Sequence, residues 1–130
     1  MTDLVLGVGI DLVDLAEFRR ICEGFEATPC AFVDRTFTPA ELAQARGRHD
    51  GCQYLAGRFA VKEAVFKAVA PLTQEGFDLR SVECLDAPTG QPEVVMDGVL
   101  AEVYASAGVS SILVSVTNET GYVEAIALAQ

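Results

Sequence analysis

The chain has 130 residues, of which 51% are hydrophobic and 22% are charged, a composition that suits one folded domain and excludes a disordered chain. Its formal net charge of −10, from nineteen acids against seven arginines and two lysines, disfavours a reader of nucleic-acid phosphates. The N-terminal segment carries an acid where a signal peptide would carry a base, and no apolar run has the length of a membrane helix, so we expect a cytoplasmic protein that does not enter a membrane.

Hydrophobic periodicity and turn residues predict the element order β-α-α-α-β-β-α-β-β. In chain order, the expected elements are a strand over 4–10 ending at Asp11, a helix over 15–25, a helix starting at Thr38, a long helix over 52–70, a strand over 77–85, a turn over 89–92, a return strand from 94 to 96, a helix over 99–107, and strands over 112–116 and 123–129. This order predicts an α+β fold in a single domain over residues 1–130, with helices packed on a mostly antiparallel sheet.

Four cysteines, Cys22, Cys30, Cys52 and Cys84, are spread over the chain. No two of them have the CxxC spacing of a zinc or redox site. With no sign of secretion, we expect all four to be free thiols in a reducing compartment.

Both lysines of the chain, Lys62 and Lys67, lie in the long helix together with Arg58 and Glu63. Three cations around one carboxylate would suit a site that binds a phosphate together with a divalent metal. The alternative is a purely structural Glu63–Lys67 pair at i,i+4, which stabilises a helix by about 0.2–0.5 kcal/mol.

Asp11 follows an apolar strand, and two roles are open to it. It can cap the next helix, as can Asp14, or it can bind a ligand at the strand end. Two carboxylates from distant segments, Asp11 and Glu63, beside cationic side chains would suit Mg²⁺ and a diphosphate.

Other catalytic patterns are absent from the sequence. His49 is the sole histidine and lies in a polar loop segment, so a zinc site built on histidines is excluded. No GxxxxGK[ST] loop exists, and the glycines Gly7 and Gly9 do not continue as GxGxxG. We interpret Asn118 and Gly121 as turn residues of the last hairpin.

Taken in order, five segments resemble the holo-acyl-carrier-protein synthase family, the small type of 4′-phosphopantetheinyl transferase. The most specific is Tyr54-Leu-Ala-Gly-Arg-Phe-Ala-Val-Lys-Glu-Ala64, followed by Lys67-Ala68. The supporting segments are Gly9-Ile-Asp-Leu-Val13, Arg35-Thr-Phe-Thr38 with Glu41, Thr89-Gly-Gln-Pro92 and Ser115-Val-Thr-Asn-Glu119. The resemblance therefore runs from one end of the chain to the other.

The resemblance implies transfer of 4′-phosphopantetheine from coenzyme A to a serine of an apo acyl carrier protein or carrier domain, with release of adenosine 3′,5′-bisphosphate, in fatty acid or polyketide biosynthesis. It implies Mg²⁺ held by Asp11 and Glu63, charge stabilisation by Lys67, and Glu63 as a candidate base for the serine hydroxyl. It also implies a homotrimer with active sites at subunit interfaces. The implied coenzyme A residues are Arg58, Lys67, Gly90, Gln91, Pro92 and Asn118, and the implied carrier-docking residues are Arg19 and Arg20.

The chain departs from the family pattern at four positions. Glu17 stands where an arginine is frequent, Ala70 where glycine is usual, Gln91 where the lysine of Gly-Lys-Pro is usual, and Asn118 where histidine is usual. These changes leave two alternatives open: the fold is reused for a different enzymatic step on a carrier-bound intermediate, or the chain is a non-catalytic carrier-binding subunit.

Overall fold

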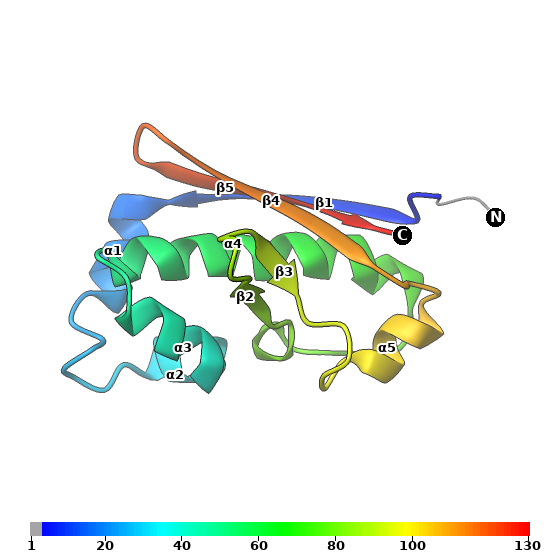
Figure 1. The fold of residues 1–130 in the computed structure, drawn as a ribbon, viewed down its shortest axis with the longest axis horizontal. Coiled ribbons are helices and arrows are strands. Elements are labelled where there is room, and N and C mark those ends of the chain that lie inside the picture. The colour runs from blue at the N-terminus through cyan, green and yellow to red at the C-terminus, as the bar shows by residue number, and fades with distance from the viewer. Residues whose placement is uncertain (1–3) are drawn as a thin grey trace.

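Helix α4 (Gly51–Val69) lies across one face of a three-stranded antiparallel sheet whose strand order is β1-β5-β4 (Figure 1). The computed structural model describes residues 4–130. Strands β1 (Gly7–Asp14), β5 (Tyr122–Ala129) and β4 (Ile112–Glu119) each have eight residues and pair along their whole length. The predicted α+β class is confirmed, with helices on one face of an antiparallel sheet.

The shorter elements lie on the helix side of this sheet, as Figure 1 shows. They are α1 (Leu15–Cys22), α2 (Ala31–Thr36), α3 (Pro39–Arg46), the 3₁₀ turns η1 (Ala70–Leu72) and η2 (Leu79–Ser81), the hairpin of β2 (Cys84–Asp86) and β3 (Pro92–Val94), and α5 (Ala101–Ser106). Within residues 4–130, no helix combines the length and the apolar character that a membrane crossing requires.

The backbones of β1 and α4 approach so closely that two positions of β1 have no room for a side chain. A Cβ atom on Gly9 would lie 1.8 Å from the carbonyl oxygen of Ala64, and one on Gly7 would lie 2.1 Å from that of Ala68. The glycines therefore let β1 lie directly on the helix, which brings the next inward-facing residue, Asp11, next to α4.

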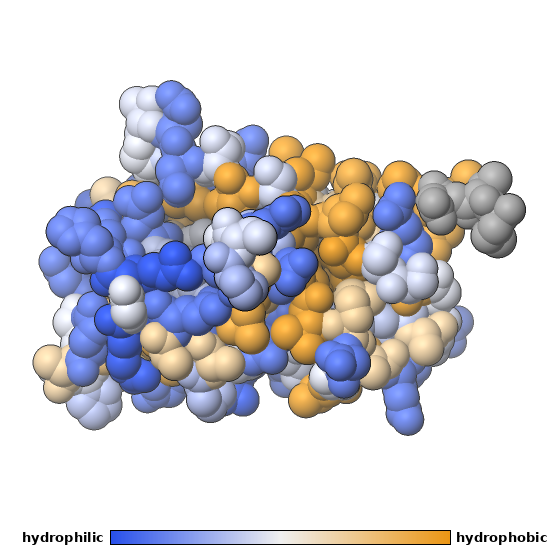
Figure 2. Space-filling model, viewed as in Figure 1, coloured by the Kyte–Doolittle hydropathy of each residue, from blue (hydrophilic) through white to orange (hydrophobic). Residues whose placement is uncertain are grey.

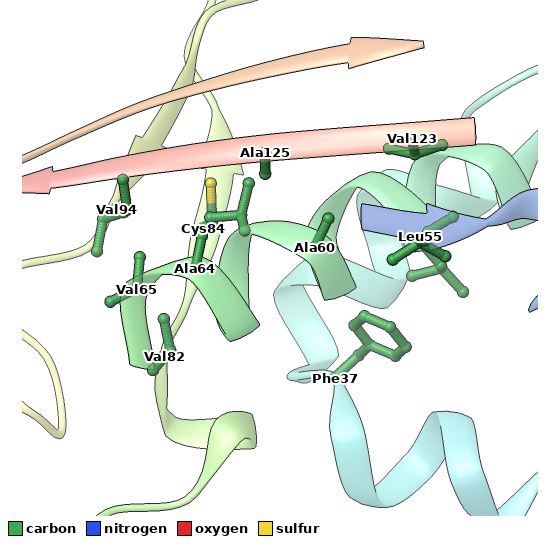
Figure 3. Close-up of a cluster of buried hydrophobic side chains, with 14 of the residues drawn as sticks. Phe37, Leu55, Ala60, Ala64, Val65, Val82, Cys84, Val94, Val123 and Ala125 are labelled. Atoms are coloured by element: carbon green, nitrogen blue, oxygen red, sulfur yellow. The ribbon is translucent and has the colours of Figure 1, made fainter. Parts of the chain in front are cut away.

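The hydrophobic core fills the space between α4 and the sheet on one side and α4 and the short elements on the other (Figure 3). Small and β-branched residues of α4, such as Ala60, Ala64 and Val65, are fully buried. Val123 and Ala125 of β5 contact them from the sheet, and Phe37 and Val82 are among the buried side chains of the helix side.

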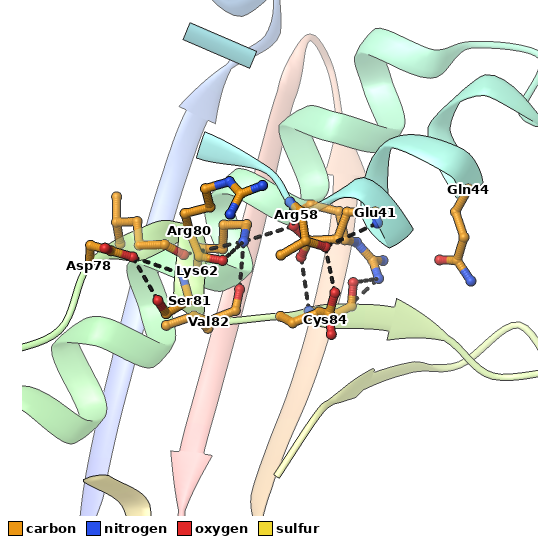
Figure 4. A network of polar contacts seen from close by, with 12 residues as sticks. Glu41, Gln44, Arg58, Lys62, Asp78, Arg80, Ser81, Val82 and Cys84 are labelled. Atoms are coloured by element: carbon orange, nitrogen blue, oxygen red, sulfur yellow. Dashed lines mark hydrogen bonds and ion pairs between the residues drawn. The ribbon is translucent and has the colours of Figure 1, made fainter. Parts of the chain in front are cut away.

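A fully buried ion pair joins α4 to α3 and to the segment before β2 (Figure 4). Lys62 Nζ lies 2.8 Å from Glu41 Oε1, with both side chains at 0% exposure, and it also donates to the carbonyl oxygens of Leu79, Arg80 and Val82. Glu41 completes the predicted capping box with Thr38 and accepts a hydrogen bond from the backbone N–H of Cys84.

That ion pair explains why the predicted strand over 77–85 is wrong. Three carbonyl groups of this segment turn toward one buried ammonium group, so they cannot form a strand ladder. Residues 79–81 form η2 instead, and β2 has only three residues.

Other predictions about elements also need correction. The helix predicted over 15–25 ends at Cys22, and the return strand predicted over 94–96 is β3 at Pro92–Val94. Strand β1 does not end at Asp11 but continues to Asp14, which caps α1 by accepting from the backbone N–H of Glu17. Helix α2 lies in a stretch that we predicted as a loop, because six residues are too few to show a helical period. Asn118 belongs to β4 and pairs with Val123. The hairpin turn is formed by Thr120 and Gly121, which both have a positive φ.

The prediction of four free thiols is wrong for two of them. Cys22 at the end of α1 and Cys52 in the first turn of α4 form a disulfide, while Cys30 and Cys84 are free. Thirty residues separate the bonded pair, and only the packing of α1 against α4 brings them together, so no spacing motif indicates the bond. Burial raises the pKa of the Cys84 thiol to about 11, which keeps it neutral.

The outward face of the sheet is apolar and exposed. Val8, Ile10 and Leu12 of β1 are 58%, 54% and 58% exposed, and Leu113 of β4 and Ile126 of β5 extend the same face. Figure 2 shows hydrophobic residues gathered along the sheet toward the chain ends, with hydrophilic residues around the β4–β5 turn. An apolar face of this size is typical of an interaction surface.

Candidate functional site

Asp11, Glu63 and Lys67 form a carboxylate centre between β1 and α4. Lys67 Nζ donates to Asp11 Oδ1 at 3.2 Å and to the carbonyl oxygen of Ile10 at 3.0 Å. The two carboxylates line one cavity of about 310 Å³, whose other walls include Phe18, Phe32 and Phe59. The structure thus brings together the three residues that the sequence singled out as metal ligands and charge stabiliser.

The carboxylate centre holds more negative charge than its one lysine neutralises. The pKa of Glu63 is raised first by burial and then by the negative charge of Asp11, while Lys67 opposes the rise. A divalent cation would relieve this repulsion, and hard oxygen ligands are those that Mg²⁺ prefers. Residues 4–130 contain no cluster of three or more Asp, Glu, His or Cys side chains fit for a metal, so further ligands would come from a substrate or water.

A second and larger cavity, of about 580 Å³, lies on another side of α4. The cavity is lined by residues of α4, of the β2–β3 turn and of β4, among them Arg58, Gly90, Gln91, Pro92 and Asn118. These are five of the six residues that the family resemblance assigned to coenzyme A, and the volume is in the range of small-molecule sites.

The two cavities do not merge within one chain. Arg58 and Lys67 are nine residues apart on α4, so they point about 180° apart around the helix axis and about 13 Å apart along it. Lys62 belongs to neither cavity because it is buried against Glu41.

The hypothesis of three cations around Glu63 is therefore wrong, because of the three only Lys67 lies at the carboxylate centre. The alternative of a direct Glu63–Lys67 ion pair is not what the structure shows either, since Lys67 binds Asp11.

The two arginines of helix α1 differ in their partners. Arg20 is exposed, whereas Arg19 makes a two-point ion pair with Asp50, at 2.9 Å and 2.5 Å, that joins α1 to the N-cap of α4. The hydrogen bonds of this pair raise the pKa of Arg19 and lower that of Asp50. Both predicted docking residues reach solvent: Arg20 is exposed, and the side chain of Arg19 is 38% exposed despite its ion pair.

Among the residues of the larger cavity that sequence reasoning missed are Arg48, Tyr54 and Asp86. Both guanidinium groups, of Arg48 and Arg58, lie over the Tyr54 ring, 4.9 Å and 4.8 Å from its centre. Burial raises the pKa of Tyr54 to about 12, so its hydroxyl stays protonated and donates to Gln44. Tyr54 opens the most specific family block, but nothing in the sequence pairs it with two arginines.

Comparison with known proteins finds the same family along almost the whole chain. The family model described as the 4′-phosphopantetheinyl transferase superfamily matches residues 7–127. The holo-[acyl-carrier-protein] synthase of Desulforudis audaxviator is 37% identical over 126 residues, which cover 97% of this chain and 93% of the relative.

Solved structures agree with the sequence relatives. The crystal structure of holo-[acyl-carrier-protein] synthase from Neisseria meningitidis has a TM-score of 0.81 at 30% identity, covering 98% of this chain and 99% of that one. The Helicobacter pylori synthase in complex with coenzyme A has the same fold, with a TM-score of 0.74 at 22% identity over 95% of this chain and 99% of that one.

Proposed function

Because the chain belongs to the holo-[acyl-carrier-protein] synthase family of the 4′-phosphopantetheinyl transferase superfamily and is such an enzyme, we propose that its two cavities together form the site that transfers phosphopantetheine from coenzyme A to acyl carrier protein. The observation that carries the proposal is the carboxylate centre, where Asp11 and Glu63 line one cavity and Lys67 forms an ion pair with Asp11. The larger cavity receives the nucleotide part of coenzyme A, and the carboxylate centre receives its diphosphate.

The residues of the carboxylate centre fit Mg²⁺ as a cofactor. Asp11 and Glu63 would hold the ion. The pKa of Glu63 is raised first by burial and second by the charge of Asp11, and a bound cation would oppose both effects. When bound, the ion would neutralise charge on the diphosphate that develops during phosphoryl transfer.

Two side chains of this centre have separate roles in the reaction: Lys67 stabilises charge, and Glu63 accepts a proton. Lys67 is held beside Asp11, where its ammonium group stabilises negative charge on the reacting phosphate. Glu63, whose pKa is raised mainly by burial, accepts the proton of the carrier serine. The serine oxygen then bonds to the phosphorus that bears the pantetheine, the bridging phosphorus–oxygen bond breaks, and adenosine 3′,5′-bisphosphate leaves.

The separation of the two cavities around α4 supports a site shared between copies of the chain. One subunit would supply the carboxylate centre and its neighbour the nucleotide cavity. The exposed apolar face of the sheet, which includes Val8, Ile10 and Ile126, is a surface on which such copies can pack, and a homotrimer is part of the proposal. Arg20 of α1 is proposed to contact the carrier protein.

Mass spectrometry of apo acyl carrier protein, incubated with the enzyme, coenzyme A and Mg²⁺, tests the proposal. We expect the carrier to gain the mass of phosphopantetheine, and to gain none with EDTA or with Glu63→Gln. Arg46→Gln, at an exposed position on the last turn of α3, is a control that should keep the activity. An unmodified carrier with wild-type enzyme, across several carrier proteins, would contradict the proposal.

A further inference from the structure

Three of the four cysteines lie close to one another where α1 meets the start of α4. Cys22 is the last residue of α1 and is bonded to Cys52 in the first turn of α4. The free thiol of Cys30 donates to the carbonyl oxygen of Ile21 at 3.2 Å, one residue before the bonded Cys22. The proposed transfer chemistry uses none of these sulfur atoms, so it does not explain a third thiol beside a disulfide.

The three cysteines differ in how far solvent reaches them. Cys22 is fully buried, and Cys52 is 8% exposed. Cys30 is partly exposed, and the four residues before it, 26–29, are all exposed. A small molecule that reacts with thiols therefore meets Cys30 before it can reach the disulfide.

A surface loop joins α1 to Cys30. Local turn hydrogen bonds hold this loop, from the backbone N–H of Phe25 to Cys22 and from that of Thr28 to Gly24, and Gly24 has a φ of 82°. Local bonds of this kind in an exposed segment open at low cost. The thiol of Cys30 can therefore approach Cys22 while α4 and the sheet stay folded.

The two helices that carry these cysteines also form part of the carboxylate cavity. Phe18 of α1 and Phe32 of α2 both line it, and their ring centres are 5.8 Å apart in an edge-to-face arrangement. Phe18 lies one helical turn before Cys22, and Phe32 lies two residues after Cys30. A change in the bonding of the cysteines therefore displaces the aromatic wall of the cavity.

Helix α1 has a second connection to the start of α4. Arg19 binds Asp50, the N-cap of α4, with both side chains about one-third exposed, at 38% and 35%. An ion pair exposed to this degree holds less firmly than a covalent bond, but it keeps the two helices together when the disulfide is broken. Reduction therefore loosens the end of α1 without releasing the helix.

We propose that Cys22, Cys30 and Cys52 form a thiol–disulfide switch that adjusts how well the carrier protein fits the carboxylate cavity. The inference rests on the proposed function for the identity of the protein that the switch affects. The bonded form holds Phe18 and Phe32 in place, and the reduced form lets the end of α1 move. The sequence predicts a reducing compartment, where the disulfides that do form are usually transient and redox-sensing.

Reduction proceeds by thiol–disulfide exchange with a small-molecule thiol of the glutathione class. The Cys30 thiolate attacks the sulfur of Cys22, so a Cys22–Cys30 bond forms and Cys52 leaves as a thiolate. The small thiol then attacks the sulfur of Cys30 and releases the Cys22 thiolate. A second small thiol attacks the first one on Cys30, which frees Cys30 and yields a small-molecule disulfide. Two small thiols are oxidised, and their protons end on Cys22 and Cys52. The reverse steps remake the bond.

Peptide mass spectrometry at a series of ratios of reduced to oxidised glutathione, with alkylation of free thiols, tests the exchange. We expect the folded wild-type enzyme to pass reversibly between the bonded and the reduced form, with glutathione on Cys30 and a Cys22–Cys30 peptide as intermediates. Cys30→Ser is the matched control, which should keep the Cys22–Cys52 bond and lose both intermediates. A bond that resists excess reduced glutathione until the protein unfolds would overturn the inference, as would equally fast exchange in Cys30→Ser.

Thermal unfolding and transfer kinetics of the two forms give the second readout. Reduction should lower the Tm by about 10 °C, the effect of opening a disulfide loop of this length in a chain of this size. It should raise the KM for the carrier protein severalfold and leave the KM for coenzyme A unchanged. Cys22→Ala, which removes the shared partner of both disulfides, should show the higher KM at every glutathione ratio. Alkylation after each assay checks the thiol state, because coenzyme A itself carries a thiol.

The wild-type forms decide the outcome even where Cys22→Ala does not fold. An equal KM for the carrier in the bonded and the reduced form would overturn the inference. Absent transfer in both forms, together with a rise of hydrogen exchange on reduction that is confined to residues 15–32, would refute the proposed function and support the switch. Hydrogen exchange that reduction leaves unchanged in this segment would contradict the switch itself.

Discussion

At the scale of single residues, Lys62 shows how misleading a cation in a functional motif can be. It lies one position before Glu63, yet its ammonium group is completely buried and paired with Glu41. Burial lowers the pKa of Lys62, and the charge of Glu41 opposes that shift. Such a pair adds little net stability compared with apolar residues, but breaking it leaves an unpaired buried charge.

Lys62→Met should therefore lower the free energy of unfolding by about 3–5 kcal/mol. Adding Glu41→Gln should recover part of this loss, because the amide is neutral and can still accept the backbone N–H of Cys84. Urea unfolding of the two variants and of wild type measures both effects. A loss below about 1 kcal/mol in Lys62→Met would mean that the pair is hydrated in solution.

Glu63 gives a prediction about pH. Its pKa is raised in the folded protein, so the folded state binds the proton more tightly than the unfolded state and the ionised carboxylate destabilises the fold. This penalty is present above the raised pKa and disappears as the pH falls below the ordinary value of 4.5.

In metal-free protein at neutral pH, Glu63→Gln should therefore have a higher Tm than wild type, and the difference should vanish in acid. Added Mg²⁺ should reverse the order, because only wild type can bind the ion with both carboxylates. Differential scanning calorimetry with EDTA and with Mg²⁺ measures all of these states. A variant that is less stable than wild type with EDTA would show that Glu63 has a structural partner.

The carboxylate centre could be predicted from the sequence, and the ion pair of Arg48 with Asp86 in the larger cavity could not. Asp11, Glu63 and Lys67 are residue types with a chemistry, in segments that resemble a known family, and the structure brings them together. Asp86 follows the segment 77–85 that we predicted as one strand, and its partner Arg48 is 38 residues away. Their pairing depends on how the β2–β3 hairpin packs against α3 and α4, which no local pattern encodes.

At the scale of elements, the contact between β1 and α4 decides where the carboxylate centre forms. Gly9→Ala places a Cβ atom 1.8 Å from the carbonyl oxygen of Ala64, a backbone atom that cannot move without the helix. The strand must shift away, which costs stability and moves Asp11 away from Lys67. We expect a lower Tm and weaker Mg²⁺-dependent binding of coenzyme A, measured by calorimetry, whereas Gly76→Ala, with open space around it, should change neither.

The elements that were predicted well are those with strong local signals. Helix α4 was placed within one residue at each end, and the capping box of α3 and the outer bounds of the last hairpin were also correct. The elements that were missed, α2 and η2, are short and depend on tertiary contacts. In η2 these contacts are the hydrogen bonds to Lys62, and a buried cation outweighs the β-propensity of its neighbours.

At the scale of the whole molecule, a site shared between subunits predicts that two inactive variants, each defective in a different cavity, regain activity when they are mixed. Glu63→Gln removes the carboxylate centre, and Arg58→Gln removes a buried cation of the larger cavity. Each variant alone should be inactive. After subunit exchange, a mixture should regain part of the activity, because some interfaces then join an intact centre to an intact cavity. Activity assays on the mixture, with circular dichroism to confirm that each variant folds, measure this. No recovery would mean that one chain forms the whole site.

Strand β1 has a different task on each of its faces. Asp11 points toward α4, while its neighbours Ile10 and Leu12 point outward into the exposed apolar face. If copies pack on that face, the backbone that carries the carboxylate proposed to hold Mg²⁺ is also the backbone of the interface. Dilution would then do more than separate subunits, because each released chain loses the support of the strand that positions its own carboxylate. The turnover per chain would fall with enzyme concentration, so the cell could set this activity by the amount of protein alone.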